Sequence, residues 1–322
     1  MLIRVYYNCG LSRETGQSTI YRNAVLIYNP AARGLAGKRV RRIHHSIELL
    51  RTAGHVVTAV PTPGPGTAGE IAREQAARGA DVILAAGGDG TINEVANGLI
   101  HSPVPLGILP GGTANVLGNE VGIGNGMEEA AGRLAEWVPR RIAVGLLHAA
   151  EEQPRYFLMM AGVGFDASIV NTVDPALKKK SGKLAYWVAG FKEFFRLQPL
   201  VEVRSGESTF TCTFGLASRV RDYGGTVDLA TSASLANDGF AVIGVKSRRP
   251  IGYVRFLPAA FSGRLERHPS VTVLHTKRLE FRGPAGSTVY VQVDGEAAGR
   301  LPASIEIVPD ALTLLVPPGF QG

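Results

Sequence analysis

Hydrophobic and polar positions follow two alternating patterns from residue 24 to about residue 120. Short apolar runs, typical of buried strands, occur at 24–30, 55–62, 81–88 and 105–112. Segments of helical periodicity follow them at 37–54, 68–80 and 91–100, and another helix is predicted to start in TANVLGNEVG, residues 113–122. The run DVILAAGG is almost wholly apolar, as expected for a parallel strand covered on both faces. This alternation predicts βαβ units and a parallel sheet.

The pattern changes after about residue 141, where short strand-like runs are separated by turn residues. These runs lie at 155–165, 200–218, 239–247, 270–283, 287–295 and 311–318. They predict a mostly antiparallel β-sandwich, interrupted by one helical stretch at 181–197. We therefore expect an α/β nucleotide-binding domain of residues 20–141 plus 309–322, a β-sandwich acceptor domain of residues 142–308, and an N-terminal extension of residues 1–19. The apolar end of the chain is assigned to the first domain.

Composition narrows the class of protein. Hydrophobic residues make up 45% of the 322 residues and charged residues 19%, which favours a large core over disorder. The formal net charge of +7 suits an anionic partner. The two cysteines, Cys9 and Cys212, predict neither a disulfide framework nor a zinc site. No signal peptide and no apolar run of about 18 residues is found, so we expect a cytoplasmic protein with at most peripheral membrane contact.

Two glycine turns follow successive strands of the predicted parallel sheet. GGDGT, residues 87–91, follows one strand, and PGGT, residues 110–113, follows the next. Ligands of open parallel sheets bind beyond the carboxyl ends of the strands, and helix N-termini favour phosphate. We expect Thr91 and Thr113 to be N-caps of helices that flank one cleft. The sequence contains no P-loop and no well-placed dinucleotide fingerprint.

Asp89 lies between Gly88 and Gly90 of the first turn. A carboxylate repels phosphate at contact distance, but it can bind a cation that binds phosphate. Mg²⁺ usually takes only one or two carboxylates from a protein. Asp89 is therefore interpreted as part of a magnesium network beside a nucleotide, with an ordinary turn as the alternative.

Several motifs together resemble the diacylglycerol kinase and sphingosine kinase family of lipid kinases, and most of all its compact bacterial members. They include GGDGTINEVANGL (87–99), LGILPGGTANVLGNEVG (106–122), AGVGFDA (161–167), YGGTVDLATSASLANDGF (223–240) and VDGEAAGRLP (293–302). The resemblance spans nearly the whole chain. It implies an ATP site on the α/β domain, Mg²⁺ as a cofactor, and a lipid hydroxyl as acceptor.

The resemblance also assigns nucleotide contacts by position. They are Asn29, Pro30, Arg33, Thr62, Gly88, Asp89, Gly90, Thr91, Asn93, Glu94, Gly112 and Thr113. The first loop of the family usually reads Asn-Pro-x-Ser-Gly, but Ala32 and Arg33 replace the serine and the glycine here.

Two further sites follow from the second half of the chain. Glu296 is not required by the turn it follows, and a positioned carboxylate can accept the proton of an attacking hydroxyl. The resemblance assigns Glu296 as the catalytic base, with Asp89 as its catalytic partner at the metal. It also implies a structural Mg²⁺ held by Asp238 and by the backbone carbonyls of Leu235 and Phe240. Asn237 stands where the family often has a second acid.

The expected function is an ATP- and Mg²⁺-dependent lipid kinase, with diacylglycerol as acceptor and phosphatidic acid as product. A sphingoid base or another lipid alcohol is the nearest alternative, and NAD kinase and a non-catalytic nucleotide-binding protein are further ones. We expect contact with lipid at a membrane surface and no nucleic-acid partner, and a homodimer is left open. Asp166 could orient substrate or cap a helix. The lysines at 178–183 and the aromatic residues at 186–195 suit a lipid interface or a buried helix equally.

Overall fold

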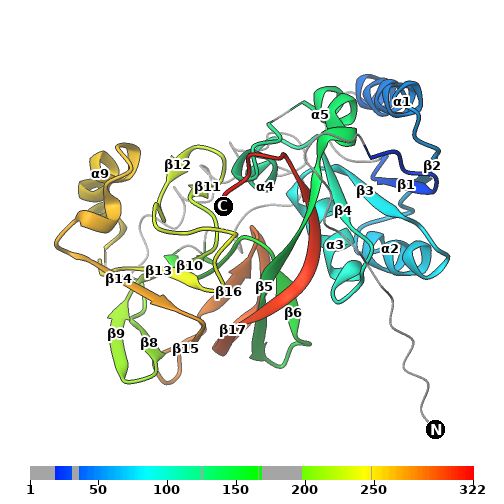
Figure 1. Cartoon of the computed structure of the whole chain (residues 1–322). Helices are drawn as coiled ribbons and strands as arrows, with labels where there is room; N and C mark the ends of the chain where they lie inside the picture. The colour runs from blue at the N-terminus through cyan, green and yellow to red at the C-terminus, as the bar shows by residue number, and fades with distance from the viewer. Residues whose placement is uncertain (1–18, 31–35, 125, 166, 169–197, 248) are drawn as a thin grey trace, which may run out of the picture.

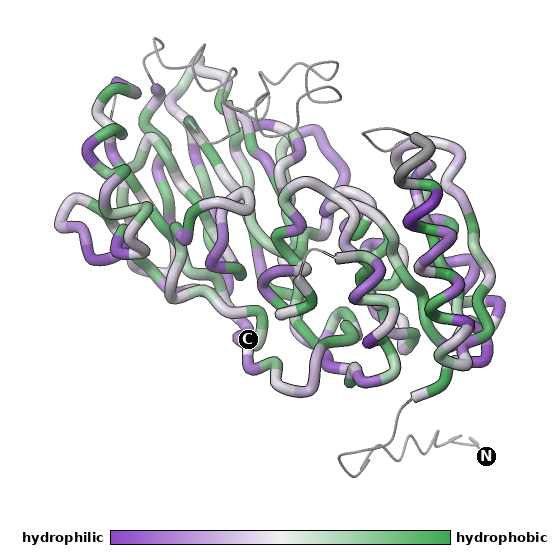
Figure 2. Tube along the Cα trace, turned by 90° about the horizontal axis from the view of Figure 1, so that it is seen from above, coloured by the Kyte–Doolittle hydropathy of each residue, from purple (hydrophilic) through white to green (hydrophobic). Residues whose placement is uncertain are grey.

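The computed structural model describes residues 19–30, 36–124, 126–165, 167–168, 198–247 and 249–322. Two parts lie side by side in it: an α/β domain and a β-sandwich (Figure 1). Viewed from above, α1 lies at one end of the molecule and the sandwich at the other (Figure 2). Within the described residues, no helix has the length and apolar character needed to span a membrane.

The α/β domain has the predicted parallel sheet. Its strands are β1 (Ala24–Tyr28), β2 (Val57–Pro61), β3 (Val82–Gly87) and β4 (Leu106–Pro110), in the spatial order β2-β1-β3-β4. All three pairings are parallel. The helices are α1 (Ala36–Thr52), α2 (Ala68–Ala77), α3 (Asp89–Leu99), α4 (Val116–Glu120) and α5 (Met127–Arg133), followed by the 3-10 turn η1 (Leu134–Glu136). Helices α1 and α5 cover one face of the sheet and α2 and α3 the other (Figure 1). The predicted alternation of strands and helices is confirmed.

Helices α2 and α3 pack backbone to backbone through two glycines. A methyl group on Gly98 would lie 2.0 Å from the carbonyl oxygen of Gly69. Gly98→Ala should therefore lower the free energy of unfolding by about 1–3 kcal/mol, the usual cost of overpacking. Denaturant unfolding measures this change. Gly132→Ala in α5 is the matched control, because its methyl group meets nothing within 4 Å and should raise stability slightly. A loss of stability in both variants alike would contradict the close helix contact.

The second part is the predicted antiparallel sandwich. One layer has the order β14-β13-β10-β7-β16, and the other contains β9, β8, β15, β17, β5 and β6. The strands of the first layer are β7 (Met160–Gly164), β10 (Phe214–Ser218), β13 (Phe240–Val245), β14 (Val271–Thr276) and β16 (Tyr290–Val293). Those of the second are β5 (Val138–Ala150), β6 (Arg155–Phe157), β8 (Val201–Ser205), β9 (Ser208–Cys212), β15 (Arg278–Arg282) and β17 (Glu296–Val316). A short hairpin of β11 (Asp222–Tyr223) and β12 (Val227–Asp228) and the 3-10 turn η3 (Leu265–Arg267) lie outside the layers. The layers share a core that includes Val163, Phe281 and Val291.

Two long strands run through both parts of the molecule. Strands β5 and β17 pair antiparallel, from Arg300 opposite Ala150 to Val316 opposite Val138. At its far end β17 also pairs parallel with β4, through Leu314 and Leu106. The sequence pattern did not predict β5, and of β17 it predicted only the last part, from residue 311. The end of the chain thus joins the sheet of the α/β domain, although the predicted domain boundaries stay a prediction.

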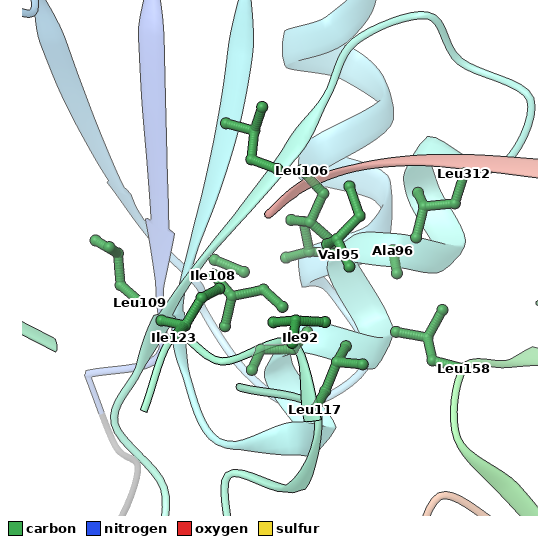
Figure 3. Close-up of a cluster of buried hydrophobic side chains, with 14 of the residues drawn as sticks. Ile92, Val95, Ala96, Leu106, Ile108, Leu109, Leu117, Ile123, Leu158 and Leu312 are labelled. Carbon is green, nitrogen blue, oxygen red and sulfur yellow. The ribbon is translucent and has the colours of Figure 1, made fainter. Parts of the chain in front are cut away.

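The cores of the two parts meet at α3. Leu312 of β17 and Leu158, just before β7, lie beside Val95, Ala96 and Ile92 of that helix (Figure 3). All five side chains are almost fully buried. The start of α3 is therefore held firmly between the parallel sheet and the sandwich.

Candidate active site

The two glycine turns lie together at the carboxyl edge of the parallel sheet. The amide of Gly111 donates to the carbonyl oxygen of Gly87 at 2.8 Å. A methyl group on Gly112 would lie 2.6 Å from the Cα atom of Gly88. Glycine is needed at these positions for the turns to touch, whatever else they bind. The predicted apposition of the two turns is confirmed.

The prediction that Thr91 and Thr113 are N-caps is wrong. The N-cap of α3 is Gly88, so Thr91 is the third residue of the helix. The N-cap of α4 is Asn115, whose φ of 49° is left-handed. The Asn115 side chain accepts a hydrogen bond from the Gly112 amide at 2.7 Å and so closes the second turn. An asparagine tolerates this conformation better than a threonine, and Thr113 stays exposed in the turn before it.

Asp89 connects the first turn to the start of α4. Its Oδ1 atom accepts a long hydrogen bond of 3.4 Å from the Leu117 amide. Burial raises the pKa of Asp89, and the backbone amides of Leu117, Val116 and Asn115 oppose that rise. A carboxylate desolvated in this way gains from a cation nearby. The position fits the predicted nucleotide-bound magnesium, for which Asp89 would be a ligand that neutralises phosphate charge.

Two of the predicted nucleotide-binding residues have side chains that are hydrogen-bonded to other parts of the protein. Asn93 is buried, and its Nδ2 atom donates to Asp294 at 2.6 Å. Glu94 accepts a hydrogen bond of 3.1 Å from the Ala68 amide, at the first turn of α2. These contacts join α3 to the sandwich and to α2. Nucleotide binding by either side chain stays a prediction.

Asp294 is the most heavily hydrogen-bonded carboxylate of the described site. It lies in the turn between β16 and β17 with a left-handed φ of 49°. Besides Asn93, it accepts from the amides of Leu158, Met159 and Met160 at 2.8 to 2.9 Å. Burial raises its pKa, and these donors oppose the rise. Asp294 therefore fixes the turn that carries Glu296 against α3, a role that the sequence alone did not reveal.

Glu296 lies against the first glycine turn. Its Oε1 atom is 3.1 Å from the position that a Cβ atom on Gly90 would occupy. The other carboxylate oxygen pairs with the Arg155 guanidinium at the start of β6. The Glu296 side chain is 41% exposed, so solvent and a substrate can both reach it. The structure thus brings Glu296 to the turn of Asp89, and it adds Arg155, which no local sequence signal indicated.

The predicted contacts at the other strand ends lie on the same edge. Asn29 and Pro30 follow β1, and Thr62 follows β2, where its amide donates to the Tyr28 carbonyl at 2.8 Å. The Thr62 hydroxyl is buried and has no hydrogen-bond partner among the described residues. Buried hydroxyls normally have a hydrogen-bond partner. We therefore expect a bound ligand to supply the partner for the Thr62 hydroxyl. Arg33 lies outside the described residues.

A buried arginine contacts the loop of the predicted structural magnesium site. The guanidinium of Arg219 donates to the Leu235 carbonyl at 3.0 Å and to the Asn237 carbonyl at 3.2 Å. It also donates to the Ala143 carbonyl. Burial lowers the pKa of Arg219 to about 10, and the charges of Asp238 and Asp294 oppose this shift. Arg219 therefore brings a positive charge to the Leu235 carbonyl, and binding of Mg²⁺ by Asp238, Leu235 and Phe240 stays a prediction.

Two other predictions fall outside the described residues. They concern Asp166 and the helical stretch at 181–197 with the lysines before it.

Comparison with known proteins identifies the class that this geometry belongs to. The fold resembles that of a crystal structure of a diacylglycerol kinase from Bacillus anthracis, with a TM-score of 0.74 and 20% identity over 93% of this chain and 99% of that one. The family model "Diacylglycerol kinase catalytic domain" matches residues 23–147, and the model "YegS C-terminal NAD kinase beta sandwich-like domain" matches residues 159–316. The molecule is a two-domain kinase with an α/β catalytic domain and a β-sandwich.

Curated relatives agree with both family models. Diacylglycerol kinase of Bacillus subtilis is 29% identical over 289 residues, which cover 87% of this chain and 92% of the relative. Diacylglycerol kinase of Mycobacterium tuberculosis is 28% identical over 287 residues, with 87% and 91% covered. The chain belongs to the diacylglycerol kinase family of lipid kinases, whose members transfer phosphate to an alcohol acceptor.

Proposed function

We propose that this protein is an ATP- and Mg²⁺-dependent lipid kinase that phosphorylates diacylglycerol to phosphatidic acid at a membrane surface. The observation that carries the proposal is the position of Glu296 against Gly90, one residue from Asp89. An acceptor hydroxyl that reaches Glu296 is then beside the turn proposed to hold the nucleotide phosphates. The names of the relatives support diacylglycerol as the acceptor.

The transfer divides into tasks for particular residues. The oxygen of the lipid hydroxyl attacks the γ-phosphorus of ATP while Glu296 takes the hydroxyl proton. The bond between that phosphorus and the bridging oxygen breaks, which releases ADP. Arg155 holds the Glu296 carboxylate in place. The glycine turns allow close approach of the phosphates, and the Thr62 hydroxyl supplies a hydrogen bond to the nucleotide. Bound Mg²⁺, held in part by Asp89, would neutralise phosphate charge.

A direct assay tests the proposed reaction. Radiolabelled ATP and Mg²⁺ are supplied with diacylglycerol, a sphingoid base, another long-chain alcohol or NAD, and the products are separated by chromatography. We expect label in phosphatidic acid. Label in another lipid would change the assigned acceptor, and label in NADP would reject a lipid kinase. ATP binding without turnover on any acceptor would reject catalysis.

Thr62→Val should separate nucleotide binding from stability. The substitution keeps the shape of the side chain and removes a buried hydroxyl that has no partner in the described part of the chain. Stability should not fall, whereas the KM for ATP should rise about two- to tenfold if that hydroxyl binds the nucleotide. Thermal unfolding and initial rates against ATP measure the two effects. Ser46→Ala removes another buried hydroxyl that has no partner within the described ranges, and it should leave the KM unchanged. An unchanged KM in both variants would remove Thr62 from the site.

A further inference from the structure

Exposed apolar side chains gather on one short segment of the sandwich domain. Among the described residues, seven large hydrophobic side chains are exposed, and four of them belong to η2 (Pro250–Phe256) and α9 (Leu257–Phe261). These four are Ile251, Val254, Leu257 and Phe261, which are 46% to 65% exposed. We call them the apolar face. Figure 1 shows that α9 projects from the sandwich at the end away from α1.

The same segment is anchored to the domain through other side chains. The Tyr253 ring stacks on Phe165 with 4.8 Å between centroids, and its hydroxyl lies 2.6 Å from that of Thr213. Phe256 and Ala260 are buried. Because these residues already provide the packing, the apolar face does not contribute to the described core. A fixed segment that still exposes four large apolar side chains indicates a binding surface.

The segment that carries the apolar face has only positive charges of its own. Residues 246–265 contain five basic residues and no acidic one. Arg249, Arg255 and Arg264 are exposed, and the Arg255 guanidinium lies over the Phe256 ring, 4.6 Å from its centroid. A basic segment with exposed Leu, Ile and Phe side chains is typical of elements that lie in the interface of an anionic membrane.

The position of the segment relates it to the candidate active site. The β11–β12 hairpin contacts α4 on one side and α9 on the other. Helix α4 begins at the turn that Asp89 contacts. We propose that the apolar face and its arginines dock the kinase on an anionic lipid bilayer. The purpose of this docking, to bring the site to a membrane-borne acceptor, rests on the proposed function, but the docking itself does not.

Vesicle binding tests the surface without any acceptor. The full chain is sedimented with vesicles of phosphatidylcholine alone or mixed with phosphatidylglycerol, both free of diacylglycerol. We expect binding to the anionic vesicles that weakens with salt. Leu257→Ser with Phe261→Ser should lower the partition coefficient roughly tenfold or more, since two apolar side chains no longer enter the interface. Arg249→Gln with Arg255→Gln should lower it about fivefold for each arginine.

The control replaces apolar side chains of similar exposure elsewhere. Ile20→Ser with Val56→Ser, which are 46% and 54% exposed in the wild type, should bind vesicles as the wild type does. Unchanged thermal unfolding confirms that each variant is folded. Equal vesicle binding by the apolar-face variant and the wild type would overturn the proposal. A second outcome would also overturn the proposal. In it, the wild type binds no vesicles and is a dimer in gel filtration, and the apolar-face variant is a monomer.

Kinase assays then separate this inference from the proposed function. With diacylglycerol in anionic vesicles, the apolar-face variant should lose activity in proportion to its lost binding. With a dispersed short-chain diacylglycerol, it should match the wild type. Absence of kinase activity on every acceptor would reject the proposed function, whereas vesicle binding would still decide the docking surface.

Discussion

Glu296→Gln is expected to lower kcat for lipid phosphorylation by about 10²–10⁴, the usual effect of losing a general base. Glutamine keeps the size of the side chain but cannot accept the proton of the attacking hydroxyl. ATP affinity should hardly change, because Glu296 reaches the turn from the sandwich side and is not a proposed nucleotide contact. Initial rates at saturating lipid, with ATP binding measured separately, test both statements.

Glu306→Gln is a matched control for this prediction. Glu306 lies in the same strand and is 39% exposed, close to the 41% of Glu296, and it also has a basic neighbour, His148, at 3.6 Å. It lies far along β17 from the glycine turn and should leave kcat unchanged. Turnover of Glu296→Gln at the wild-type rate would reject the mechanism, even though the family assignment would stand.

Arg219→Met should lower the free energy of unfolding by about 3–5 kcal/mol, as loss of one partner of a buried charged network does. Arg219 is fully buried and bonds to three carbonyls from two places in the chain, namely Ala143 and the loop of Leu235 and Asn237. Methionine fills much of the same space but leaves these oxygens without donors. It also removes the positive charge that faces Asp238 and Asp294. Denaturant unfolding measures the loss.

A comparison with metal removal makes this prediction specific. If Arg219 supplies the cation of the 235–240 loop, EDTA should leave the unfolding midpoint of the wild type unchanged. Arg282→Met, which removes an exposed arginine paired with Glu280, should cost at most about 1 kcal/mol. A large loss of wild-type stability in EDTA, restored by Mg²⁺, would show that a bound metal holds the structure instead.

Hydrophobic periodicity predicted the four parallel strands and helices α1 to α4 of the α/β domain, but not α5, and it predicted the class of the sandwich. It succeeded because burial on one or both faces leaves a local repeat in the sequence, as in the apolar run of β3. The two glycine turns were also predicted to lie together, since the carboxyl ends of parallel strands meet at one edge of a sheet. The caps were mistaken because GGDGT offers several residues that could begin a helix, and local sequence did not choose Gly88 over Thr91.

The tertiary structure alone decided the contacts between distant parts of the chain. Strand β17 is continuous because β5 pairs with it through both parts, a partner that periodicity within the segment cannot reveal. The position of Glu296 at Gly90 depends on Asp294, which binds amides before β7 and a side chain of α3. Arg219 looks like a surface residue in the sequence, and only the convergence of three carbonyls makes its burial favourable. The sequence by itself therefore determined the elements, the turns and the chemistry they could carry, since these depend on neighbouring residues. The tertiary structure decided which carboxylate lies at which turn and that Arg219 meets the carbonyls of Leu235 and Asn237, because both depend on the path of the whole chain.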